Sequence, residues 1–279
     1  MDKGKLYICP TPIGNLEDIT LRVLNTLKAV DVIAAEDTRH TLRLLNHFEI
    51  QKPLTSYHEH NRMSKGPQLV NKLLQGEKIA LVSDAGMPGI SDPGEDLIKL
   101  CIEEDIPVEV LPGATAGILA LVASGLDARR FSFEGFLDRD KKKKKERLEQ
   151  IKHEDRTLIF YEAPHRLKET LKSLSEVLGN RQAVVGRELT KKFEEFIRGD
   201  FETLLAHFQE NPPRGEIVLL CEGGVPSDHQ EEAFKDLTIQ EHLIQLIEAG
   251  MDKKQAIKEV AKARKVPKRD VYQESIELP

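Results

Sequence analysis

Short runs of apolar residues recur along the first part of the chain, and each run stops at a polar or glycine-rich segment. The clearest runs cover residues 6–9, 32–35, 79–82 and 108–111. Apolar residues at helical spacing follow three of these runs, beginning near Thr20, Glu95 and Ala114. Continuous apolar strands that alternate with helices are typical of a parallel sheet covered on both faces. The pattern therefore predicts an α/β domain over residues 1–125.

A second series of apolar runs begins near Arg130. Strands are expected at residues 131–137, 158–161, 183–185 and 217–220, with helices at about 141–152 and up to residue 178. These elements predict a second α/β domain over residues 126–226, with a break at 225–228. The remaining segment, residues 233–279, has the spacing of three short helices and resembles a helix-turn-helix.

The composition fits a soluble globular protein that is not strongly basic. Apolar residues make up 39% of the chain and charged residues 32%, with a net charge of −6. Three cysteines, Cys9, Cys101 and Cys221, lie far apart, which favours a reducing compartment over a disulfide framework. No apolar run is long enough to span a membrane, and the first ten residues lack the apolar core of a signal peptide. We therefore expect a cytoplasmic protein with no membrane partner.

Two segments depart from this acidic average. Residues 252–270 contain eight basic and three acidic side chains, a local net charge of +5. Residues 141–145 are five consecutive lysines. Such runs are usually solvated surface, but both are also candidates for binding phosphates. In the tail, the residues expected to do so include Lys262, Arg264, Lys265 and Lys268.

Three loops with glycine, proline and small polar residues come after predicted strands, at residues 11–15, 84–94 and 112–116. Ligands of open α/β sheets bind at the carboxyl ends of the strands. Glycine lets the backbone approach a ligand there, and helix N-termini offer unpaired N–H groups. The chain lacks the G-x-G-x-x-G and G-x-x-x-x-G-K-[ST] motifs, which disfavours a standard dinucleotide fold and a P-loop. We therefore expect a ligand cleft at this edge and leave the ligand open.

The second predicted strand is followed directly by Glu36, Asp37, Thr38 and Arg39. Two acids and an arginine at this edge suit catalysis, but Asp and Thr are also common N-caps of a following helix. The residues alone leave both interpretations open. The segment His58–His60 does not complete the H-E-x-x-H zinc motif, so we expect no metal.

The chain matches one family in eight successive segments, which are TPIGNLEDIT (11–20), AAEDTRHTLRLL (34–45), SYHEHN (56–61), SDAGMPGISDPG (83–94), LPGATA (111–116), FEGFL (133–137), FYEAPHR (160–166) and RELTKKFEE (187–195). Together they resemble the bacterial rRNA (cytidine-2′-O)-methyltransferases of the tetrapyrrole methylase fold group. The nearest departure is Met87, where the family pattern has threonine. The basic helical tail also resembles the small C-terminal domain of that family.

The resemblance implies two α/β domains, with a largely parallel sheet in the first and a mixed sheet in the second, plus the small helical tail. It implies that S-adenosylmethionine binds between the domains and methylates the ribose 2′-hydroxyl of a cytidine in 16S rRNA. The partner is then 16S rRNA, naked or in the small ribosomal subunit, and the family also implies a homodimer. Two alternatives remain: methylation of a tetrapyrrole or other small molecule, and non-enzymatic nucleic-acid binding through the basic tail.

The resemblance also implies site residues. The cofactor residues are expected to be Gly14, Asp84, Gly86, Met87, Ile90, Thr115, Ala116, Glu162, Thr190, Gly215 and Ile217. We expect Glu36 or Asp37 to orient or deprotonate the hydroxyl and Arg39 to hold an adjacent phosphate. If neither carboxylate acts in this way, the next candidates are Lys191, Glu162 and His58.

Overall fold

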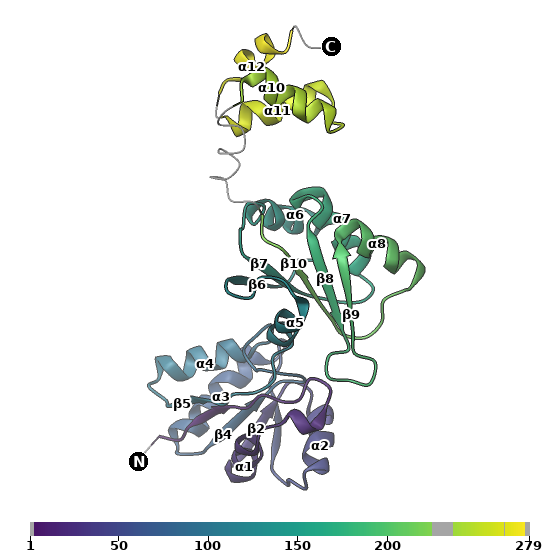
Figure 1. Cartoon of the computed structure of the whole chain (residues 1–279). Helices are drawn as coiled ribbons and strands as arrows, with labels where there is room; N and C mark the ends of the chain where they lie inside the picture. Colours follow the sequence, from purple (N-terminus) through teal and green to yellow (C-terminus); the bar gives the residue numbers. More distant parts are fainter. Residues whose placement is uncertain (1–2, 225–236, 265, 277–279) are drawn as a thin grey trace.

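The computed structural model describes residues 3–224, 237–264 and 266–276 and contains two five-stranded sheets (Figure 1). The first sheet has the order β3-β2-β4-β1-β5, and its neighbouring strands are parallel throughout. Its strands are β1 (Leu6–Ile8), β2 (Val32–Ala35), β3 (Leu54–Ser56), β4 (Ile79–Val82) and β5 (Val108–Val110). The central strands β2 and β4 are buried along their whole length, as expected for a sheet covered on both faces.

Helices cover both faces of the first sheet. They are α1 (Leu21–Ala29), α2 (Thr38–His47), α3 (Arg62–Leu74) and α4 (Gly94–Glu103), with a short 3-10 turn, η1 (Leu16–Asp18). Leu69 of α3 and Leu97 of α4 pack in one core cluster, and Leu27 of α1 and Leu45 of α2 pack in the other. All the carboxyl ends of this parallel sheet therefore meet at one edge, which leads into the loops before α2, α4 and α5 (Ala116–Ser124).

The second sheet is mixed, with the order β6-β7-β10-β8-β9. Its strands are β6 (Phe131–Phe136), β7 (Thr157–Glu162), β8 (Gln182–Arg187), β9 (Glu195–Asp200) and β10 (Ile217–Cys221). Only β6 and β7 are parallel to each other, and the other neighbouring pairs are antiparallel. The expected pair of sheets, one parallel and one mixed, is confirmed.

Different helices cover the two faces of the second sheet. One face packs against α6 (Lys141–Gln150), α7 (Leu167–Leu178) and α8 (Phe201–Glu210). The other face packs against α5, because Ala120 and Leu121 share a core cluster with Ile159, Val184 and Val218. Helix α5, which ends the first α/β unit, is thus buried against the second sheet and ties the two units together (Figure 1).

Within residues 237–264 and 266–276, the tail forms three short helices: α10 (Ile239–Glu248), α11 (Lys253–Ala263) and α12 (Lys268–Glu274). They share a small core that includes Leu243, Val260 and Val271, as the three-helix expectation requires. The predicted break at 225–228, residues 233–236, Lys265 and residues 277–279 lie outside the described residues. None of the helices in the described ranges combines the length and apolar character that crossing a membrane requires.

Candidate functional site

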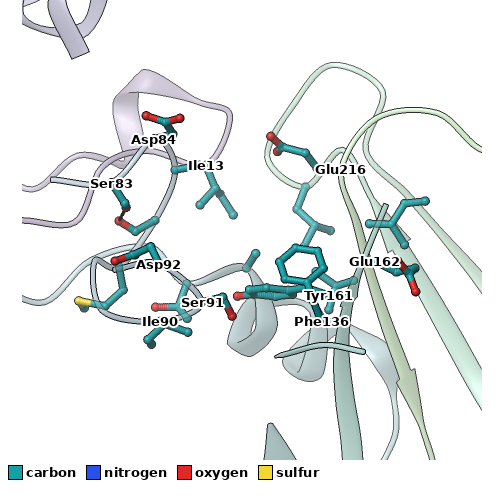
Figure 2. A pocket seen from close by; sticks show the side chains of 18 of the residues that line it. Ile13, Ser83, Asp84, Ile90, Ser91, Asp92, Phe136, Tyr161, Glu162 and Glu216 are labelled. Carbon is teal, nitrogen blue, oxygen red and sulfur yellow. Dashed lines mark hydrogen bonds between the residues drawn. The ribbon is translucent and has the colours of Figure 1, made fainter. Parts of the chain in front are cut away.

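A cavity of 490 Å³ lies where loops of the first sheet meet strand ends of the second sheet (Figure 2). We call it the first cavity. Its walls come from the ends of β2 and β4, the start of α5, the ends of β6 and β7, and the segment before β10. Figure 2 shows Asp84 and Asp92 on the side of the first sheet, and Glu162 and Glu216 on the side of the second sheet.

The loop after β4 forms one wall, and hydrogen bonds hold it in place. The backbone of Thr11 pairs with that of Gly86 in both directions, at 2.9 and 3.1 Å. The carboxylate of Asp92 accepts hydrogen bonds from the backbone N–H groups of Gly89 and Gly94. Gly86 has a φ of +81°, a conformation that favours glycine. The sequence Ser83–Gly94 thus folds into a fixed loop that turns backbone toward the cavity.

Helix α5 and strand β7 form the opposite wall. The side-chain hydroxyl of Tyr161 accepts a hydrogen bond of 3.2 Å from the backbone N–H of Gly117, in the first turn of α5. Glu162 is buried, and its carboxylate accepts hydrogen bonds from the backbone N–H of Ala163 and the hydroxyl of Thr170. Its charge also lies 3.6 Å from the guanidinium of Arg166. Glu162 is therefore a fixed, charge-balanced part of the wall.

The first cavity is acidic. The residues that line it include Glu36, Asp84, Asp92, Glu162 and Glu216 but no lysine or arginine. Burial raises the pKa of Glu36, and the nearby carboxylates of Asp84 and Asp92 raise it further. Burial also raises the pKa of Asp92. This arrangement favours a cationic ligand, because like charges in a partly desolvated site repel one another.

Most of the predicted cofactor residues are brought together here. Nine of the eleven line the first cavity, namely Asp84, Gly86, Met87, Ile90, Thr115, Ala116, Glu162, Gly215 and Ile217. The structure places Gly14 and Thr190 outside its walls. They lie at a contact between the loops after β1 and β8, where the hydroxyl of Thr190 accepts a hydrogen bond of 3.0 Å from the backbone N–H of Asn15. A side chain at Gly14 would clash with Lys191, so this glycine allows the loops to approach each other.

The three predicted catalytic residues are separated. Glu36 lines the first cavity, whereas Asp37 and Arg39 do not. Asp37 is the N-cap of α2, and its carboxylate accepts hydrogen bonds from both the backbone and the guanidinium of Arg39. The Arg39 side chain is 87% exposed. Of the two interpretations left open by the sequence, the structure gives Asp37 and Arg39 the helix-capping geometry.

The further candidates also lie apart from one another. Lys191 lines a second, neighbouring cavity and pairs with Glu188 and Glu216. His58 lines neither cavity, and its buried Nδ1 has no hydrogen-bond partner among the described residues. In the same described part of the chain, no three His, Cys, Asp or Glu side chains are grouped to hold a metal ion.

Sequence reasoning missed several cavity residues. Ser91 and Asp92 line the first cavity and were not named as cofactor residues, although they belong to the loop at 84–94 that was expected at the cleft. Phe136, Tyr161 and Glu216 line it too and were not predicted. The signal for Tyr161 was its place at the end of an apolar run, next to Glu162. Phe136 had no comparable signal, because it enters the cavity only through the pairing of β6 with β7, where it lies opposite Tyr161.

Comparisons with known proteins show which family the chain belongs to. The family model of the tetrapyrrole (corrin/porphyrin) methylases matches residues 5–205. The ribosomal RNA small subunit methyltransferase I of Bacillus subtilis (strain 168) is 51% identical over 273 residues, which cover 97% of this chain and 94% of that protein.

Solved structures show the same fold at low sequence identity. A cobalamin biosynthetic enzyme, cobalt precorrin-4 methyltransferase, has a TM-score of 0.59 at 18% identity, covering 78% of this chain and 94% of that one. Uroporphyrin-III C-methyltransferase from Thermus thermophilus, in complex with S-adenosylhomocysteine, has a TM-score of 0.55 at 19% identity, covering 78% and 97%. The family-model match and the 51% identity over 97% of the chain show that the chain belongs to the tetrapyrrole methylase family, and within it to the ribosomal RNA small subunit methyltransferase I group.

Proposed function

We propose that this protein transfers a methyl group from S-adenosylmethionine to the ribose 2′-hydroxyl of a cytidine in 16S rRNA. The observation that carries the proposal is the 51% identity to the Bacillus subtilis rRNA methyltransferase over 97% of the chain. That stretch includes every wall of the first cavity. The substrate is 16S rRNA, naked or assembled in the small ribosomal subunit. We also place the protein in the cytoplasm, where its three free cysteines would stay reduced.

The first cavity fits the cofactor in size and charge. A volume of 490 Å³ lies within the usual range of ligand pockets, about 300–1,000 Å³. Its acidic walls complement the ammonium and sulfonium charges of S-adenosylmethionine. Thr115 and Ala116 begin α5, whose first N–H groups suit the single carboxylate of the cofactor. When bound, S-adenosylmethionine supplies an electrophilic methyl group.

The chain's own contribution is to hold the acceptor hydroxyl and take its proton. A ribose hydroxyl is a weak acid, so a nearby base is needed. We assign that role to Glu36, because it is the predicted catalytic carboxylate that lines the first cavity, and burial there raises its pKa above the ordinary glutamate value. The Arg39 guanidinium is exposed and is oriented by its hydrogen bonds to Asp37. Arg39 remains our candidate for binding a phosphate next to the acceptor ribose.

The tail and helix α6 supply basic surface for the RNA. Lys254, Lys258, Lys268 and Arg269 are exposed on the tail. Arg264 has another role, because its guanidinium donates hydrogen bonds to the carbonyl oxygens of Leu237 and Thr238. We therefore no longer assign a phosphate to Arg264. In α6, Lys144 is buried against Glu169, whereas the other four lysines face solvent.

Helix α5 and strand β6 carry an exposed apolar patch that suits a homodimer interface. Helix α5 exposes Ile118, Leu119 and Val122, and edge strand β6 exposes Phe131 and Phe133 beside it. The Phe133 ring lies 3.6 Å from where a Cβ on Gly117 of α5 would stand, so the two groups form one patch. Contiguous exposed apolar residues next to an unpaired strand edge are typical of a protein interface. We therefore propose that a second copy covers this face.

The proposed function is tested by label transfer from methyl-labelled S-adenosylmethionine. The purified protein is offered small-subunit rRNA, small subunits, or a porphyrinoid macrocycle. We expect label in the RNA of at least one of the first two samples and none in the macrocycle. Label in the macrocycle alone would establish the small-molecule alternative, and absence of cofactor binding by calorimetry would favour the non-enzymatic one.

A further inference from the structure

A second cavity, of 470 Å³, lies beside the first and shares a wall with it. The residues common to both are Ile13, Ser83, Asp84, Ala85 and Glu216. The remaining walls come from the loop after β1, from helix α2 and from Lys191. A group placed at the shared wall can therefore face a ligand in either cavity.

The two cavities differ in charge. The first is lined by five carboxylates and by no lysine or arginine. The second adds His40, Arg43 and Lys191 to the shared Asp84 and Glu216. A phosphodiester is repelled by the first set of walls and can be bound by the second. The charge pattern thus separates a place for a cationic donor from a place for an anionic acceptor.

Arg43 is the basic group in the second cavity that is available to a ligand. It lies exposed on α2, and within the described residues its guanidinium makes no ion pair or hydrogen bond. His40 precedes it by three residues on the same helix, so both side chains lie on one face. Lys191 differs, because its ammonium group is held 3.0 Å from both Glu188 and Glu216. Lys191 therefore has a structural role in the cavity wall, whereas Arg43 and His40 are available to bind a phosphate.

We infer that the second cavity holds the acceptor nucleotide of the RNA, with a backbone phosphate bound by Arg43 and His40 and the ribose at the shared wall. The planar guanidinium of arginine can donate two parallel hydrogen bonds to the oxygens of one phosphate. The ribose then lies beside Asp84, across from Glu36 in the first cavity. This inference rests on the proposed function and names Arg43 and His40 as substrate-binding residues of that same site.

The test compares Arg43→Gln, Arg43→Lys and His40→Gln with wild type. The matched control is Arg22→Gln, an arginine on α1 that lines neither cavity. For each protein, filter binding to small-subunit rRNA is measured over a range of salt, together with S-adenosylmethionine affinity by calorimetry and single-turnover methylation against RNA concentration.

We expect Arg43→Gln to raise the RNA concentration for half-maximal rate about tenfold, the effect of removing one charged interaction of about 1.4 kcal/mol. Its log–log salt slope should shrink by roughly 0.7–0.9, the value for one bound phosphate. Arg43→Lys should recover part of this effect, and cofactor affinity should stay within twofold of wild type in every variant.

Two results would overturn the inference in distinguishable ways. If wild type methylates rRNA while Arg43→Gln and His40→Gln keep the RNA dependence and salt slope of Arg22→Gln, the second cavity is not the acceptor site and the proposed function stands. If wild type transfers no methyl group to any rRNA sample, the proposed function fails and this inference fails with it.

Discussion

Glu36 and Asp37 are neighbours in sequence and occupy opposite environments. Glu36 lines the first cavity, where burial, Asp84 and Asp92 raise its pKa. The pKa of Asp37 is lowered, chiefly by its hydrogen bonds with Arg39. The sequence could not separate them, because both follow β2 and both suit either catalysis or capping. What distinguishes them is the direction in which each side chain leaves the strand end.

We predict opposite effects of Glu36→Gln on activity and stability. Loss of a catalytic base should lower the single-turnover rate by roughly 10²–10⁴-fold. Because its pKa is raised, the Glu36 carboxyl binds a proton more tightly in the folded protein than in the unfolded chain. Protonation of Glu36 therefore stabilises the fold, and this contribution is lost as the pH rises through the raised pKa. Glutamine cannot ionise, so it avoids the cost of burying a charged carboxylate at neutral pH. The melting temperature of Glu36→Gln near pH 7 should therefore exceed that of wild type.

The melting-temperature difference should vanish below the ordinary glutamate pKa of about 4.3, where the carboxyl is neutral in the folded and the unfolded chain. Asp37→Asn is the matched control, because it keeps most of the cap and lies outside the first cavity. Near-normal single-turnover rates in Glu36→Gln would remove Glu36 from the chemistry, and a lower melting temperature at neutral pH would contradict its unfavourable burial.

At the scale of elements, strands that are short apolar runs in the sequence were predicted, including the half-exposed β5 and β6, whereas β3 and β9 were not. Strands β2 and β4 are uninterrupted apolar runs, and their predicted bounds agree with the structure. Strand β3 has only three residues, all half-buried, and β9 is an edge strand with charged residues. Neither presents a periodic apolar pattern, so their positions came only from pairing with neighbours.

The loop after β4 carries the second prediction. Gly86→Ala places a Cβ 3.2 Å from the Ile13 side chain and 3.3 Å from the Ala114 carbonyl oxygen, at a φ of +81°. Gly125→Ala is the control, because its φ is +82° and nothing lies within 4 Å. We expect both to lose stability, but only Gly86→Ala to weaken S-adenosylmethionine binding, by about tenfold or 1.4 kcal/mol. Equal cofactor affinities by calorimetry would exclude this loop from the cofactor site.

The tail helices carry the third prediction. Changing Lys254, Lys258, Lys268 and Arg269 to glutamine should weaken rRNA binding and reduce its log–log salt slope by roughly 0.7–0.9 for each phosphate that is no longer bound. Cofactor affinity should not change, because none of these residues lines the first cavity. Arg264→Gln should instead loosen the tail itself, which hydrogen exchange would detect. An unchanged salt slope in the fourfold variant would make the tail a structural element.

At the scale of the whole molecule, the site exists only where two sheets meet. The first sheet provides Glu36 and Asp84, and the second provides Glu162 and Ile217. The parallel edge and its glycine loops were predictable from the residues, because strand ends of one sheet must gather at one edge. The contribution of the second sheet was predictable only through the family resemblance, since it depends on α5 packing against that sheet.

Assembly carries the fourth prediction. Val122 is 76% exposed on α5, and Val122→Arg places a charge in the proposed dimer face. Leu21→Arg is the control, because Leu21 is also apolar and is 79% exposed on α1. Light scattering after gel filtration should give a dimer for wild type and Leu21→Arg and a monomer for Val122→Arg. A monomeric wild type, or a dimeric Val122→Arg, would place the interface elsewhere or remove it.

The central claim is methyl transfer to a ribose oxygen, and its most direct test is the position of the methyl group. Small-subunit rRNA is incubated with the protein and methyl-labelled S-adenosylmethionine and then digested to nucleosides. Fragmentation in a mass spectrometer then gives the masses of the ribose and the base separately. We predict label in a single nucleoside, cytidine, with the added mass on the ribose fragment and none on the base. Label on the base, label in another nucleoside, or unlabelled RNA beside labelled small molecules would contradict the account.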